Sequence, residues 1–160
     1  TYQLPEAQID RFMVKLSIGY PTFEDEVNIV TKGERAKQTI SSVIAKEDIN
    51  ALSAQAKRVT VSRLVSCYIV SLVTATRNHP DLKLGSSPRG SIALYNLSRA
   101  YALLQGRNYV LPDDVKYLAP FVLGHRIILT HAAKTEKKDP LELIRGIVKD
   151  VVVPVEPEEK

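Results

Sequence analysis

The sequence SPRGSIALYNLSRAYALLQG, residues 87–106, decides how this chain folds. Ser87 and Pro88 are typical of the first residues of a helix, where a hydroxyl caps free N–H groups and proline fits the first turn. Gly106 is the residue type that commonly ends a helix. Between them, apolar side chains cover most of the helix circumference. The pattern therefore predicts a long, central helix in a mainly helical domain.

Shorter helical patterns flank this segment on both sides. Ser62 is placed to cap a long helix with a broad apolar stripe, and Thr22 with Asp25 has the spacing of a capping box. Besides residues 87–106, helices are predicted over residues 5–12, 22–36, 46–57, 62–78, 112–124 and 140–150, whereas residues 132–139 read as a polar loop.

One segment near the beginning of the sequence alternates like a strand. Over residues 13–18, Val14, Leu16 and Ile18 fall on one side of an extended chain and polar side chains fall on the other. A lone strand is marginal in water, so this pattern suggests that the sheet to which it belongs has been cut away. Candidates for a small sheet within the helical domain are residues 43–44, 59–61 and 109–110.

Composition restricts the class of protein. The chain has 160 residues, of which 44% are hydrophobic and 25% charged, as expected for one folded domain. No apolar run approaches the ~20 residues that span a membrane, and Cys67 is the single cysteine, which excludes an internal disulfide. A cytoplasmic protein is therefore the default expectation.

Three long stretches, far apart in the sequence, carry a recognisable pattern. They read LPEAQIDRF at residues 4–12, ATRNHPDLKLGSSPR at residues 75–89 and YVLPDDVK at residues 109–116, the last followed by His125 and Arg126. In this order and spacing they resemble the MoxR type of AAA+ ATPases, from residue 1 to about residue 154.

This resemblance implies a fold and an assembly. Such ATPases combine a P-loop α/β domain with a helical lid, and ATP lies between subunits of a ring that is usually a hexamer. On that template residues 1–20 are the end of the α/β core and are expected to be poorly held. Residues 21–153 form the helical lid, and residues 154–160 form a flexible acidic tail. We expect a mainly α fold with short β pieces.

The phosphate-binding parts of such an ATPase are missing from this sequence. It contains no G-x-x-x-x-G-K-[ST] motif and no apolar strand that ends in paired acidic residues for magnesium. We therefore expect a piece of a longer protein, which is inactive alone, mainly monomeric and without a bound cofactor. ATP and Mg²⁺ are implied for the full-length parent.

Two arginines are the candidate site residues. Arg11 follows a short helix, and the resemblance places it where an arginine finger would reach the γ-phosphate of the neighbouring subunit in trans. Arg89 lies in the first turn of a helix, where the helix dipole disfavours a cation. By resemblance Arg89 is the sensor-two arginine, which touches the ATP phosphate of its own subunit in cis. No metal site is predicted, and the roles of Arg77, His79 and Arg126 stay open.

Two helix starts depart from the family pattern. Leu111 and Ala45 occupy cap positions at which the family usually or often has Ser or Thr. Because an N-cap contributes roughly 0.5–2 kcal/mol, we expect both helix ends to be looser than usual.

The implied activity is chaperone-like remodelling or maturation of protein complexes, driven by ATP. Partners would be other ring subunits, client complexes and proteins with von Willebrand A domains, without nucleic acid. One alternative is a helical module that binds nucleic acid, for which the predicted helix at 112–124 offers only Lys116. The other is a protein-interaction domain without a nucleotide role, against which the position of Arg89 argues.

Overall fold

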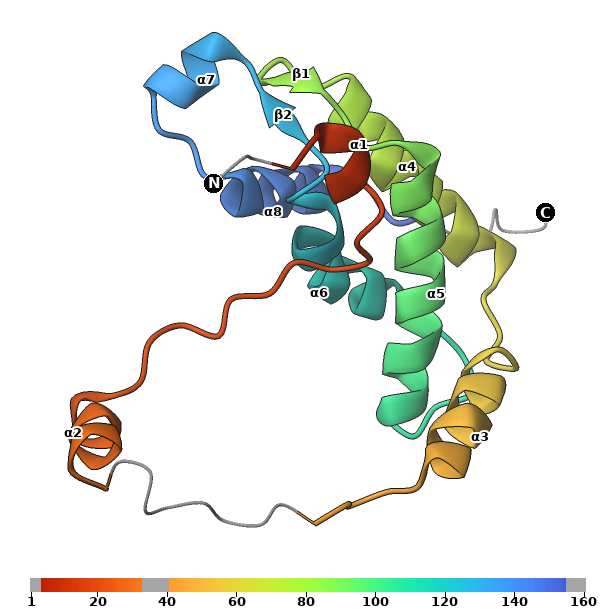
Figure 1. The fold of residues 1–160 in the computed structure, drawn as a ribbon. Coiled ribbons are helices and arrows are strands. Elements are labelled where there is room, and N and C mark those ends of the chain that lie inside the picture. Colours follow the sequence, from red (N-terminus) through yellow and green to blue (C-terminus); the bar gives the residue numbers. More distant parts are fainter. Residues whose placement is uncertain (1–3, 33–40, 155–160) are drawn as a thin grey trace.

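The computed structural model describes residues 4–32 and 41–154. Within these ranges the chain is mainly helical, as predicted (Figure 1). In chain order the elements are α1 (Glu6–Ile9), α2 (Phe23–Lys32), α3 (Lys46–Ala56), α4 (Arg63–Arg77), β1 (Leu82–Leu84), α5 (Pro88–Leu104), α6 (Pro112–Leu123), β2 (Ile128–Leu129), α7 (His131–Thr135) and α8 (Pro140–Asp150).

The long helices begin where their capping residues predict. The hydroxyl of Ser87 accepts a hydrogen bond from the backbone N–H of Arg89 at 3.2 Å, and that of Ser62 accepts one from Val65 at 3.2 Å. Gly106 follows α5 with a φ of +73°, a backbone conformation that glycine adopts without steric cost. The predicted bounds of α4, α5, α6 and α8 are therefore confirmed to within about one residue.

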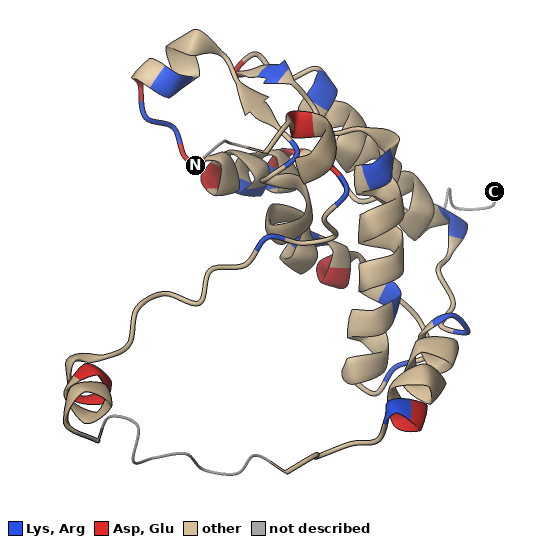
Figure 2. Ribbon diagram, viewed as in Figure 1, with Lys and Arg blue, Asp and Glu red and all other residues tan. Residues whose placement is uncertain are grey.

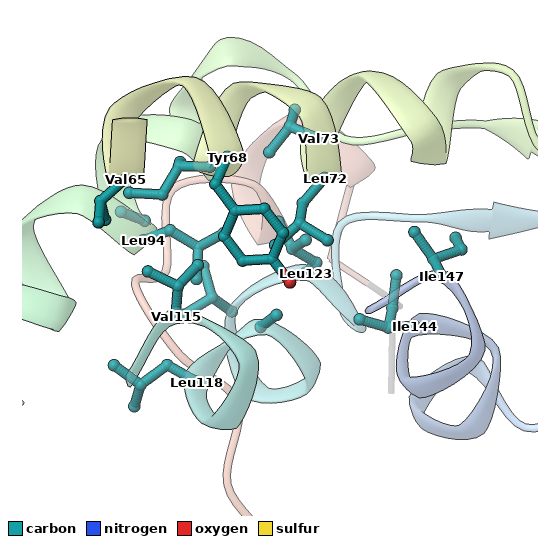
Figure 3. Packing of buried hydrophobic residues seen from close by; sticks show 14 of the residues in the cluster. Val65, Tyr68, Leu72, Val73, Leu94, Val115, Leu118, Leu123, Ile144 and Ile147 are labelled. Carbon is teal, nitrogen blue, oxygen red and sulfur yellow. The ribbon is translucent and has the colours of Figure 1, made fainter. Parts of the chain in front are cut away.

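The hydrophobic core lies between α4, α5, α6 and α8 (Figure 3). Tyr68 and Leu72 of α4 meet Leu94 of α5 and Val115 of α6 there, and all four side chains are fully buried. The expectation that residues 87–106 form the central helix needs a correction. Both α4 and α6 pack against the other three helices, whereas α5 packs mainly on α4 and α6 and leaves apolar residues such as Leu104 exposed. The number of apolar residues around a helix does not by itself show which of them are buried in the core.

Short extended pieces differ from the prediction in part. Thr60 and Tyr109 form a parallel bridge, as expected, but residues 43–44 are exposed and unpaired within the described chain. An antiparallel pair, β1 with β2, was not predicted. Residues 132–139 were expected to be a loop, yet α7 occupies the first half of them, because Thr130 caps that short helix by accepting from Ala133.

Leu111 and Ala45 have no hydroxyl to cap their helices, but an aspartate in the first turn of each helix partly replaces that cap. Asp114, three residues into α6, accepts the backbone N–H of Leu111 at 2.8 Å, and Asp48 accepts that of Ala45 at 2.9 Å. Each carboxylate thus satisfies one free N–H group at the helix start and favours the helix dipole. Half of a reciprocal capping box is present at both ends.

Residues 13–18 form no strand in this structure. Lys15 donates its backbone N–H to the carbonyl of Phe121 at 3.0 Å, while Leu16 and Ile18 point into solvent. The chain then runs to α2, which lies apart from the other helices and leaves Phe23 exposed (Figure 1). A ladder needs a neighbouring strand on at least one side, and no described segment supplies it here.

Candidate functional site

Arg11 and Arg89 come together although 77 residues separate them along the chain. Both line a pocket of about 250 Å³ between the end of α1 and the first turns of α5. Basic segments at the start of α5 and an acidic segment on α1 lie in the same part of the molecule (Figure 2). The remaining lining residues are Asp10, Met13, Ile92, Ala93, Asn96 and Arg126.

The turn before α5 fixes the backbone of Arg89. A Cβ atom at Gly85 would lie 2.5 Å from backbone atoms of Arg77, so only glycine lets this turn pack directly against α4. The guanidinium of Arg77 then donates from Nε to the carbonyl of Ser86 at 2.8 Å, and Ser86 donates its backbone N–H to the hydroxyl of Thr76 at 3.0 Å. These contacts give Arg77 a structural role and explain the LGSSPR stretch.

Asp10 is the charged centre of the site. Its carboxylate accepts hydrogen bonds from the hydroxyl of Ser87 at 2.9 and 3.1 Å. It also lies 3.3 Å from Nε of Arg126 and 3.8 Å from a terminal nitrogen of Arg89. One carboxylate, 22% exposed, therefore faces two guanidinium groups and the first turn of α5.

Arg126 is buried, and its terminal nitrogens are held by backbone carbonyls. Its side chain is 2% exposed, and its terminal nitrogens donate to the carbonyls of Asp10 at 3.3 Å, Phe12 at 2.5 Å and Met13 at 3.2 Å. It donates as well to the carbonyl of Val122 in α6. Burial lowers the pKa of Arg126 and the Asp10 carboxylate opposes that shift. An arginine nevertheless keeps its proton at neutral pH.

His125 adds a second clamp on the same segment. Its Nε2 lies 2.9 Å from the carbonyl of Phe12, and because a carbonyl only accepts, Nε2 carries the proton. Burial is the main reason that the pKa of His125 is lowered, with the Phe12 carbonyl acting in the opposite direction. His125 and Arg126 together hold residues 10–13, so the expectation that residues 1–20 are poorly held is wrong for that part.

Four of the described arginines fall into two groups. Arg126 and Arg107 are held in place, the latter by both oxygens of the Asp114 carboxylate at 2.5 and 2.8 Å. Arg11 is exposed, and its side chain makes no hydrogen bond or ion pair within the described residues. Arg89, 56% exposed, has only the 3.8 Å contact with Asp10. Two guanidinium groups at one pocket are thus available for an anion.

The sequence proposes Arg11 and Arg89 as site residues but gives no role to the residues that surround them in the structure. In the sequence, Asp10 is only one residue of the stretch at 4–12, and Ser87 is only a helix cap. Arg126 belonged to a matched stretch without a role. One signal in the sequence could have indicated these residues. Asp10 lies beside the candidate Arg11, and a carboxylate that becomes partly buried needs a cation as its partner.

Other kinds of site leave no trace in the described chain. Residues 4–32 and 41–154 contain no group of three or more His, Cys, Asp or Glu placed to hold a metal ion. The same residues include no helix that is both long and apolar enough to span a membrane.

Comparison with known proteins gives consistent results. Residues 74–147 match the family model of the AAA lid domain. The chain is 47% identical over 158 residues to protein YeaC of Bacillus subtilis, which covers 98% of this chain and 49% of the relative. It is 33% identical over 162 residues to Chaperone MoxR1 of Mycobacterium tuberculosis, covering 96% of this chain and 43% of the relative.

A solved structure agrees with these relatives. A crystal structure from Cytophaga hutchinsonii, described as a candidate ATPase, superposes with a TM-score of 0.86 at 32% identity. The match covers 96% of this chain and 50% of that one. This chain therefore spans about half the length of the proteins that it matches.

Proposed function

This chain belongs to the MoxR family of AAA ATPases and contains their lid domain, and from that premise we propose that it supplies the lid and two phosphate-contacting arginines of an ATP-driven, chaperone-like remodelling ATPase. The full-length protein would bind ATP and Mg²⁺ through segments outside this sequence. Residues 1–20 would belong to its α/β core, residues 21–153 to the lid and residues 154–160 to a tail.

The observation that carries the proposal is the pair of uncommitted guanidinium groups at one pocket. Arg11 and Arg89 are both exposed at this pocket, whereas Arg107 and Arg126 are held by a carboxylate or by carbonyls. Guanidinium groups bind phosphate oxygens through paired N–H donors, so the residues present fit a triphosphate. ATP would supply the negative charge of its phosphates, and Mg²⁺ would neutralise part of that charge.

In this proposal the chain's own residues position and stabilise rather than react. Arg11 donates to the γ-phosphate bound by a neighbouring subunit, where negative charge develops during transfer to water. Arg89 contacts the phosphate of its own subunit, and because it sits on α5 it links lid position to nucleotide state. A phosphate that approaches Arg89 competes with Asp10 for this guanidinium.

The shared pocket also supports a second arrangement of the same two residues. If both arginines keep the orientation seen here, they face one phosphate, and Arg89 then serves the neighbour together with Arg11. Mixed rings decide between the two arrangements. Subunits that cannot hydrolyse ATP but keep both arginines are mixed with R11A or with R89A subunits of the full-length protein.

The expected outcome separates the trans role from the cis role. R11A should lose ~10³-fold in turnover with ATP binding largely intact, as for other arginine fingers. Mixing should restore turnover to R11A and leave R89A impaired, since a cis defect stays with its own subunit. Rescue of both variants supports the shared-phosphate arrangement. Turnover in R11A rings close to that of the wild type would refute the finger role.

The assembly and the partners follow from the same proposal. Ring subunits, usually six, would bring Arg11 to the neighbour's nucleotide, and lid motion would be transmitted to client complexes, together with partners that carry von Willebrand A domains. We place the protein in the cytoplasm. A protein-interaction role without nucleotide is the alternative, and it predicts that R89A leaves ATP binding and turnover unchanged.

A further inference from the structure

The buried guanidinium of Arg126 controls the backbone on both sides of Arg11. It donates to the carbonyls of Asp10, which precedes Arg11, and of Phe12 and Met13, which follow it. The side chain of Arg11 has no anchor of its own among the described residues. The direction in which Arg11 projects is therefore set through its backbone, and that backbone is held by Arg126.

Arg126 is itself fixed to the helical domain. It donates to the carbonyl of Val122 in the last turn of α6, and the neighbouring His125 donates to the carbonyl of Phe12 at 2.9 Å. The α6 helix packs on α5, which carries Arg89. Movement of this helical pair is consequently passed to residues 10–13 without an intervening flexible segment.

The chemistry of the contact requires an arginine. The planar guanidinium has five N–H donors in a fixed fork. At this site its two terminal nitrogens donate to four carbonyls, and its Nε lies 3.3 Å from the Asp10 carboxylate as an ion pair. A lysine ammonium has three donors and no such plane, so it can keep the ion pair with Asp10 but cannot bridge all the carbonyls. Loss of Arg126 also leaves Asp10 without its closest cation.

We propose that Arg126 is the positioning residue for Arg11 and makes it move with the lid. The inference rests on the proposed function, because it assumes that Arg11 acts on a neighbour's nucleotide. Arg126 also lines the pocket, but its side chain is only 2% exposed and its terminal nitrogens are committed to backbone carbonyls. It acts by holding the 10–13 backbone, which places it between the lid and the neighbouring active site.

The test uses the full-length ATPase with the variants R126M and R126K. Misplacement of a catalytic group by about 1 Å can cost ~10²-fold in rate, so R126M should lose ~10²-fold in kcat. Its KM for ATP should stay within about threefold of the wild type, because the residue does not bind ground-state nucleotide. R126K should fall between the two, since it restores charge without the fork.

R107M is the matched control. Arg107 is also paired with a carboxylate and is 21% exposed, but its hydrogen bonds are to Asp114 and Tyr109 near the start of α6 and not to residues 10–13. A loss of kcat in R126M and R126K no larger than in R107M would overturn the proposal, and so would a change confined to KM. If R126M fails to assemble, R126K is judged by the same two criteria.

Mixed rings distinguish a misplaced Arg11 from a general folding defect, because only the former is rescued by a neighbouring subunit with an intact Arg11. Subunits that cannot hydrolyse ATP but keep Arg11 and Arg126 should rescue R126M to the same extent as R11A. Rescue of R11A without rescue of R126M refutes the positioning role alone. Absence of rescue for R11A refutes the proposed function of Arg11 instead, so the two failures are distinguishable.

Discussion

At the scale of single residues, the site shows how burial divides one residue type into two uses. Arg126 and Arg89 both carry a guanidinium group, yet the side chain of Arg126 is 2% exposed and that of Arg89 is 56% exposed. Removing water from Arg126 makes its contacts with carbonyls and Asp10 obligatory. The solvent around Arg89 leaves the 3.8 Å pair weak and exchangeable. We therefore expect R89A to change the free energy of unfolding by less than about 1 kcal/mol in denaturant melts.

His125 makes stability depend on pH. Because burial lowers the pKa of His125 below its ordinary value of 6.5 in the folded chain, the unfolded chain takes up the proton first as pH falls. The contribution is complete above pH 6.5 and is lost progressively on acidification below that value. Urea melts at pH 7.5 and 5.5 should show a larger loss of stability for the wild type than for H125Q, whose amide keeps a donor without titrating. An equal loss in both proteins would exclude His125 as the sensitive group.

At the scale of elements, the turn before α5 decides where Arg89 lies. A methyl group at Gly85 meets the backbone of Arg77 at 2.5 Å, so G85A must push the turn away from α4. We expect G85A to be destabilised by about 1–3 kcal/mol, as for other overpacked sites. Gly146 in α8 is the matched control, since a Cβ there meets nothing within 4 Å, and G146A should gain about 0.5–1 kcal/mol from helix propensity. Thermal melts of equal stability for the two variants would contradict the packing argument.

Ser87 joins the α5 cap to the site. Its hydroxyl accepts from the Arg89 backbone and donates to Asp10, whereas Ser62 at the start of α4 accepts from Val65 and has no acidic partner. S62A should cost about 1 kcal/mol for the lost cap. S87A should cost more, by roughly another 1 kcal/mol for the hydrogen bond to a carboxylate, and the excess should vanish when S87A is combined with D10N.

The same elements show what sequence can and cannot predict. The helices α4, α5, α6 and α8 follow from capping residues and apolar periodicity because these signals are local. The pairing of β1 with β2, the bend at residues 13–18 and the clamp on residues 10–13 depend on segments brought together from more than forty residues away. Family resemblance proposes Arg11 and Arg89, whereas the contacts of Asp10, His125 and Arg126 cannot be predicted locally because they exist only once the segment after α1 meets the end of α6.

At the scale of the whole molecule, the helical body and the segment that leaves it should behave differently. Residues 14–20 have one backbone hydrogen bond to the body, from Lys15 to Phe121, whereas the core of α4 is fully buried. Amide exchange should be fast over residues 16–20 and slow at Leu72 and Val73. We expect the isolated chain to sediment as a monomer at micromolar concentration and to release no phosphate from ATP. A hexamer-sized species or sustained turnover would contradict these expectations.

The Arg126 clamp also has a topological consequence. Residues 10–13 are fastened to the end of α6, and α3 is fastened to α5, so the stretch between them leaves the helical body and returns to it. In polymer terms this stretch is a closed loop, because contacts with the helical domain fix both of its ends. Doubling the length of a flexible loop costs only about 0.6 kcal/mol. A whole foreign domain inserted near Gly19 should therefore leave the lid core folded, and this exposed segment is a suitable point at which to attach a reporter.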